Sequence, residues 1–184
     1  HVVGNIGDYL FTWMALALPI VYLLPSGIVA IFYLMGITYM GAEVGYFNAG
    51  DYQGIHKYWL MLIVLAPYYY WMMQNKRKSN FLNFLNWLIP ISVILNLGIF
   101  ADKNEEWMLL AYISLFGVLY NLGALQKWFK DSFGGNGFKF LGSLGTIIIL
   151  LISSFREFWG EFRINDGVMT SPEFYIFFLL ALIA

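Results

Sequence analysis

The stretch Phe138–Phe162, FKFLGSLGTIIILLISSFREFWGEF, decides the fold class that this sequence predicts. It holds no charged side chain from Phe140 to Phe155, and charged residues stand on both sides of that run. A helix from Lys139 to Trp159 is long enough to cross a hydrocarbon core of roughly 30 Å. The stretch therefore predicts a membrane-spanning helix, and most of the chain repeats the same plan.

The composition agrees with a membrane protein. The chain has 184 residues, of which 60% are hydrophobic and only 11% are charged, whereas soluble domains contain about 25% charged residues. Aromatic residues make up 20%, which suits a protein with two membrane interfaces to anchor. The net charge of -1 argues against a nucleic-acid partner. The absence of cysteine excludes disulfides and zinc–thiolate sites, and no pattern indicates a cofactor.

Apolar segments alternate with polar, glycine-containing or proline-containing turns along the whole chain. They lie at Tyr9–Leu24, Ile28–Phe47, Tyr58–Gln74, Phe81–Ala101, Trp107–Trp128 and Lys139–Trp159, and a last, incomplete one begins at Phe174. The predicted fold class is all-α, a polytopic transmembrane helix bundle of about seven spans with the last one truncated. We expect residues 1–184 to form a single transmembrane helical domain and to be an interior piece of a longer membrane protein.

Basic and small residues add detail to this prediction. The loop Lys76–Lys78 and the loop with Lys127, Lys130 and Lys139 fall on one face, which the positive-inside rule places in the cytoplasm. Gly41, Gly45 and Ala49 recur every four residues, a spacing that lets helix backbones approach closely in lipid.

Two stretches carry recognisable features. Leu24–Phe47, LPSGIVAIFYLMGITYMGAEVGYF, has a Leu-Pro-Ser turn before an apolar helix, and Phe138–Phe162 has a glycine-containing apolar helix ending in Ser-Ser-Phe and then Phe-Trp. In these features the chain resembles a bacterial family of polytopic membrane proteins known only as a domain of unknown function. The resemblance implies an integral protein of the bacterial cytoplasmic (inner) membrane. It implies no established activity and no catalytic residues.

Glu43 is the most unusual candidate residue, because it is an ionisable side chain near the outer end of an apolar segment. Two interpretations are open: Glu43 is a carboxylate that binds protons or substrate inside the bundle, or it is an interfacial residue whose side chain reaches the lipid headgroups. Arg156 and Glu157 lie at the outer end of the segment Lys139–Trp159, where Arg156 would bind an anionic group or fix the depth of the helix. We also expect Glu43 and Arg156 to approach one another.

Other polar residues give weaker signals. Asp51 and His56 are weak candidates for an acid–base pair or a metal site, because two ligands five residues apart without a third are poor evidence for a metal. Asn86, Asn96 and Asn121 are expected to be buried and to bond between helices.

Three functional classes remain open. The first is a transporter or channel-like domain, and the second is a structural or assembly subunit. The third is a membrane enzyme acting on a lipid-linked substrate at the outer face, for which Asp8, Glu43, Arg156 and Glu157 would have to converge. The expected partners are membrane lipids and other membrane subunits or missing spans of the same chain. The sequence favours a non-enzymatic domain.

Overall fold

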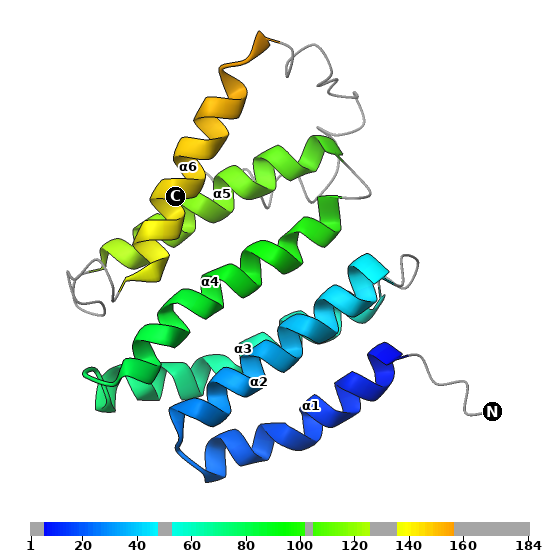
Figure 1. Cartoon of the computed structure of the whole chain (residues 1–184), viewed down its shortest axis with the longest axis vertical. Helices are drawn as coiled ribbons and strands as arrows, with labels where there is room; N and C mark the ends of the chain where they lie inside the picture. The colour runs from blue at the N-terminus through cyan, green and yellow to red at the C-terminus, as the bar shows by residue number, and fades with distance from the viewer. Residues whose placement is uncertain (1–5, 48–52, 102–104, 126–135, 157–184) are drawn as a thin grey trace. The chain divides into compact units, whose positions relative to one another are not determined.

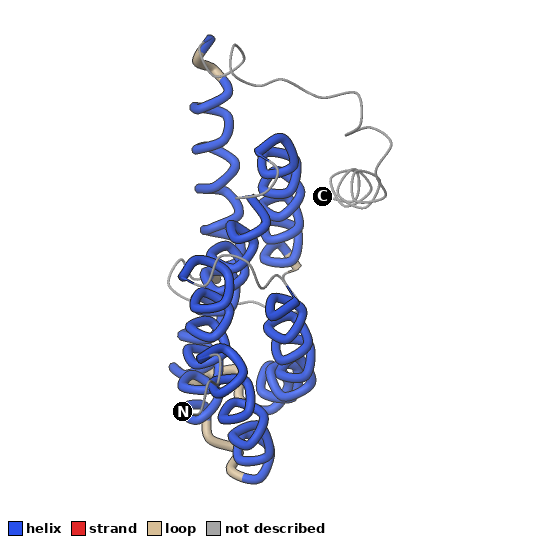
Figure 2. The backbone as a smooth tube through the Cα atoms, turned by 90° about the vertical axis from the view of Figure 1, so that its right-hand side faces the viewer, coloured by secondary structure: helices blue, strands red, loops and turns tan. Residues whose placement is uncertain are grey.

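The computed structural model of the chain describes residues 6–47, 53–101, 105–125 and 136–156. These residues form six α-helices and one π-helical turn, and the tube in Figure 2 shows no strand among them. The elements are α1 (Ile6–Leu23), α2 (Gly27–Ala42), the π-helical turn η1 (Glu43–Phe47), α3 (Gln53–Asn75), α4 (Asn80–Ala101), α5 (Glu105–Ala124) and α6 (Gly137–Ser153). The predicted all-α class is confirmed.

Three of these helical segments are long and apolar enough to cross a membrane, namely Ile6–Leu23, Gly27–Phe47 and Asn80–Ile99. Two further apolar helices, Leu109–Ala124 and Gly137–Ser153, are shorter. The prediction of about seven spans is therefore wrong for the described part of the chain. The segment predicted from Phe174 onward lies outside the described residues. Helix α3 is 23 residues long, but its four tyrosines and polar ends make it less apolar than the other long helices.

The helix predicted from Lys139 to Trp159 is shorter in the structure. Helix α6 has 17 residues, which is about 25 Å of helix, and it ends at Ser153. The Ser154 N–H donates to the carbonyls of Leu150 and Leu151, and the Ser154 hydroxyl donates to the Leu151 carbonyl at 2.7 Å. A serine hydroxyl offers the backbone a local partner that competes with helix continuation.

The structure consists of two compact units, unit 1 (His1–Ile99) and unit 2 (Phe100–Ala184), which are described separately. In unit 1 consecutive helices run in alternating directions, as the blue-to-green ribbons of Figure 1 show. The Lys76 ammonium donates a 2.8 Å hydrogen bond to the Pro25 carbonyl, so the α1–α2 and α3–α4 turns lie at the same end. The starts of α1 and α3 meet at the other end, where Lys57 pairs with Asp8.

Helices α2 and α4 are parallel neighbours with a constant register. A Cβ added to Gly27 would lie 2.4 Å from Phe81 Cβ, and one added to Gly45 would lie 2.3 Å from Ile99 Cγ2. Between these pairs, the Thr38 and Ser92 hydroxyls are 2.6 Å apart. In each pair the α4 residue follows its partner on α2 or η1 by 54 positions (81 minus 27, 99 minus 45, 92 minus 38). Gly41 and Gly45 face the Asn96 and Ile99 side chains of α4. The approach of helix backbones expected at this spacing stays a prediction, and Ala49 lies outside the described residues.

Unit 2 is described as a close pair of helices, α5 and α6. A Cβ on Gly142 would lie 2.5 Å from Tyr120 N and 2.9 Å from the Phe116 carbonyl oxygen, so the two backbones are in direct contact. Asn136 caps α6 by accepting from the Lys139 N–H at 3.1 Å, and its amide donates to the Gly123 carbonyl at 2.7 Å. Asn136 therefore ties the start of α6 to the end of α5.

Candidate functional site

Four polar side chains from three helices meet inside unit 1. Thr38 comes from α2, Tyr58 from α3, and Ser92 and Asn96 from α4; we call them the polar cluster. Tyr58, Ser92 and Asn96 are 0%, 2% and 1% exposed, and Thr38 is half-buried. Ser92 and Asn96 share one face of α4 because residues four apart on a helix are neighbours. The cluster is thus an uncharged polar site enclosed by apolar helices.

The hydrogen bonds of the cluster run in one direction. The Thr38 hydroxyl donates to the Leu34 carbonyl at 2.6 Å, and it has only one hydrogen to give. In its 2.6 Å contact with Thr38, the Ser92 hydroxyl must therefore be the donor. By the same argument, the Tyr58 hydroxyl donates to Ser92 across 2.7 Å. Because the Leu34 carbonyl accepts the Thr38 hydrogen, the donor in each of the other two hydrogen bonds is determined, and all three hydroxyl hydrogens are used.

Asn96 leaves one acceptor unsatisfied. Its amide nitrogen donates to the Ser92 carbonyl at 3.0 Å, but its buried Oδ1 accepts no hydrogen bond from the residues that the structure describes. This oxygen lies over Gly41, only 1.9 Å from where a Cβ would stand. Buried acceptors are normally satisfied, so this oxygen marks the cluster as unusual.

The α2 helix changes its hydrogen-bond pattern directly after Gly41. The Glu43 N–H donates to both the Met40 and Tyr39 carbonyls, and η1 begins at Glu43. The Tyr46 hydroxyl of η1 donates to the Leu95 carbonyl of α4 at 2.8 Å. Single π-helical turns are rare and occur often at functional sites. Glu43, the leading candidate from the sequence, therefore opens an irregular turn two residues beyond the glycine that faces Asn96.

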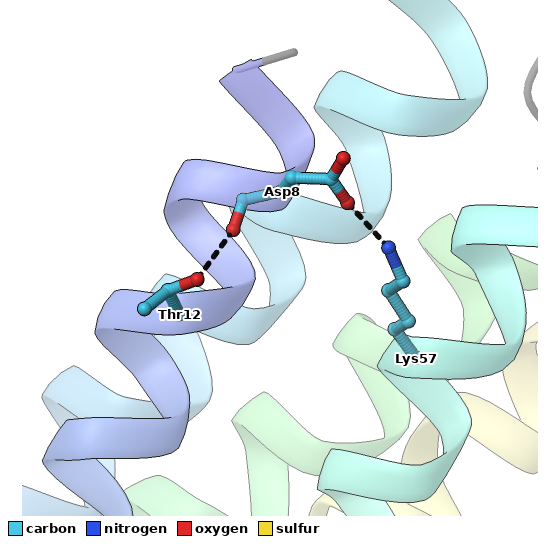
Figure 3. A network of polar contacts seen from close by, with 3 residues as sticks. All are labelled: Asp8, Thr12 and Lys57. Carbon is cyan, nitrogen blue, oxygen red and sulfur yellow. Dashed lines mark hydrogen bonds and ion pairs between the residues drawn. The ribbon is translucent and has the colours of Figure 1, made fainter. Parts of the chain in front are cut away.

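Asp8 lies in an exposed ion pair rather than in the polar cluster. Figure 3 shows its carboxylate directed at the Lys57 ammonium, 2.5 Å away, while the Thr12 hydroxyl donates to the Asp8 carbonyl. The Lys57 ammonium also lies 5.3 Å from the centre of the Phe11 ring. Since the Asp8 and Lys57 side chains are 62% and 36% exposed, this pair contributes little to stability.

The remaining candidates belong to separate units or lie outside the described residues. Arg156 is an exposed residue of unit 2, while Asp8 and Glu43 belong to unit 1. Glu157 lies outside the described residues. The expected convergence of these four residues, and the pairing of Glu43 with Arg156, therefore stay predictions.

The metal-site reading finds no support in the described ranges. His56 is exposed, and Asp51 lies outside the described residues. Within the described ranges, no three or more His, Cys, Asp or Glu side chains are grouped so that they could hold a metal ion.

The three candidate asparagines differ in their surroundings. Asn86 is buried and accepts a 2.7 Å bond from the Tyr69 hydroxyl of α3, as predicted. Asn96 is buried, but its amide bonds within its own helix. Asn121 is exposed and its amide bonds the Gly117 carbonyl of its own helix, so the expectation that it is buried is wrong.

Sequence reasoning missed Thr38, Tyr58 and Ser92. The four-residue spacing of Ser92 and Asn96 was the available signal, because it places two polar side chains on one face of an apolar helix. Comparison of the chain with protein-family models, with curated proteins and with solved structures finds no match.

Proposed function

We propose that the chain is an integral, transporter-like membrane protein that uses the polar cluster of unit 1 to bind a small solute. Membrane insertion is supported by the outer face of α1. Exposed apolar side chains follow it from end to end at helical spacing: Ile6, Tyr9, Trp13, Leu16, Ile20 and Leu23. A continuous apolar stripe of this kind is unfavourable in water and suits lipid.

The polar cluster is the observation that carries the transporter-like reading. Hydroxyl and amide groups inside a hydrocarbon layer are costly unless they are paired, and one acceptor of this cluster, Asn96 Oδ1, has no partner among the described residues. Here they stand between three helices, beside a π-helical turn that opens with Glu43. The four members carry no formal charge and include no general base, which favours binding over chemistry.

The two alternatives rest on other features. An assembly subunit would use the cluster only to fix helix register, and the constant α2–α4 offset suits that role. A membrane enzyme would require the convergence of Asp8, Glu43, Arg156 and Glu157, which stays a prediction. The solvent access of the cluster separates the first alternative from transport.

We propose that the protein lies in the bacterial cytoplasmic membrane with Lys76–Lys78 on the cytoplasmic side. His56 and Arg77 are exposed; His56 lies in the first turn of α3, and Arg77 lies two residues after the helix ends. The chain has no cysteine of its own. An impermeant maleimide added to intact cells should label His56→Cys and spare Arg77→Cys, while permeabilised cells should show both labelled. If only Arg77→Cys were labelled in intact cells, the proposed orientation would be wrong and the opposite one would hold. Equal labelling of both variants in intact cells would contradict membrane insertion.

Solvent access to the cluster tests the proposed activity. Ser92→Cys is close in size to the native residue, and a small charged thiosulfonate should modify it in reconstituted protein if the cluster opens to water. Leu85→Cys is the matched control, since Leu85 is a 1% exposed residue of the same helix outside the cluster. We expect Ser92→Cys to react at least about tenfold faster than Leu85→Cys. Equal, slow modification of both would favour the structural role.

A further inference from the structure

We propose that the polar cluster binds a monovalent alkali cation, with Asn96 Oδ1, Ser92 Oγ and Tyr58 Oη as its oxygen ligands. This inference rests on the proposed function, because it names the solute that the cluster would take. It begins from the unequal numbers of donors and acceptors at the site.

The cluster offers acceptors and no free hydroxyl donor. The hydroxyl hydrogens of Tyr58, Ser92 and Thr38 are used in the chain that ends at the Leu34 carbonyl. Asn96 donates to the Ser92 carbonyl, and its Oδ1 is a buried acceptor without a partner among the described residues. A cation would meet the oxygen dipoles that it needs here, whereas an anion would find only the second N–H of the Asn96 amide as a donor.

The charge of the site selects a monovalent ion. Divalent Ca²⁺ and Mg²⁺ are usually held by carboxylates, but the four members of the cluster are neutral. Neutral oxygens arranged around an ion can replace its hydration shell, as carbonyl oxygens do in potassium-selective filters. In several transporters the coupling ion lies beside a helix that departs from α-helical geometry, and η1 begins two residues after Gly41.

The oxygens come from separate helices, which would couple the ion to helix packing. Tyr58 belongs to α3, whereas Ser92 and Asn96 belong to α4, and Asn96 Oδ1 rests over Gly41 of α2. A bound cation would therefore hold α3 and α4 together next to α2. This predicts a melting temperature that depends on the identity of the cation.

The test uses the purified full chain in detergent. Its melting temperature is measured in LiCl, NaCl or KCl and in N-methyl-D-glucamine chloride, at equal ionic strength. We expect a saturable rise with one alkali ion, of about 5 °C or more when the ion is in hundredfold excess over its Kd. Ser92→Ala should lose the rise. Ser114→Ala should keep it, because Ser114 is an equally buried serine of α5 whose hydroxyl bonds the Ala111 carbonyl.

A second pair of variants covers the case in which Ser92→Ala does not fold. Tyr58→Phe should lose the cation effect, whereas Tyr33→Phe, which removes another buried phenol that bonds Met61 Sδ, should keep it. Identical melting in all four salts would overturn the proposal, as would a cation effect that survives both cluster variants. Modification of Ser92→Cys without any cation effect would leave the transporter-like function standing and remove the cation. A cation effect with an unreactive Ser92→Cys would make the ion structural and contradict transport.

Discussion

Replacing Gly142 by alanine is expected to separate α5 from α6 and to cause the largest loss of stability among the substitutions considered for this protein. The new Cβ would lie 2.5 Å from Tyr120 N, 2.8 Å from Tyr120 Cα and 2.9 Å from the Phe116 carbonyl oxygen. These are backbone atoms, so no side-chain rotation can relieve the overlap, and the helices must move apart. Overpacking of a close contact costs about 3 kcal/mol at the upper end of its usual range.

Amide hydrogen exchange measured by mass spectrometry gives the local readout for this variant. Peptides from α5 and α6 should exchange faster in Gly142→Ala, while peptides from α1 to α3 should be unchanged. Ser143→Ala is the neighbouring control, since the Ser143 hydroxyl bonds the Lys139 carbonyl of its own helix. Unchanged exchange in α5 and α6 would show that the two backbones are not in contact at Gly142.

Gly41→Ala is expected to have the second-largest effect and to disturb the polar cluster directly. Its Cβ would meet Asn96 Oδ1 at 1.9 Å and Asn96 Cγ at 2.9 Å. The Asn96 side chain is 1% exposed and its amide donates to the Ser92 carbonyl. It can therefore move only by giving up that bond or by pushing α4 away from α2. We expect a loss of about 2 kcal/mol in the free energy of unfolding.

The melting temperature of Gly41→Ala, measured beside that of Gly36→Ala, tests this expectation. Gly36 lies on the same helix, and a Cβ there would meet Met14 Sδ at 2.3 Å, which is part of a flexible side chain that can turn aside. Gly41→Ala should melt several degrees lower than Gly36→Ala. Equal melting of the two variants would mean that Asn96 does not rest against α2.

Apolar run length predicted the helices well, but it did not predict where they end. The segments drawn at Phe81–Ala101 and Ile28–Phe47 differ from α4 and from α2 with η1 by only one residue. Helix α3 extends back to Gln53, into residues whose polar character indicated a loop. Helix α6 ends at Ser153, six residues before the predicted end at Trp159. Hydropathy does not mark such an end, because the apolar run continues to Phe155.

The candidate site was harder to predict from the sequence than the fold. Glu43 stood out because an ionisable residue in an apolar segment is rare, and it does open η1. Thr38, Tyr58 and Ser92 did not stand out, since single hydroxyls are common in apolar helices and each can bond its own backbone. Their meeting depends on the offset between α2 and α4, which is a property of helix packing.

That offset also sets the order in which the protein can mature during synthesis. The face of α2 that carries Thr38 and Gly41 is covered by residues about 54 positions later in the chain. At about 5–20 residues per second, a ribosome takes roughly 3 to 11 s to make them. For that interval the newly made α2 has only α1 and then α3 to lie against. Thr38, its one member of the polar cluster, is then open to lipid, to the insertion machinery or to another chain.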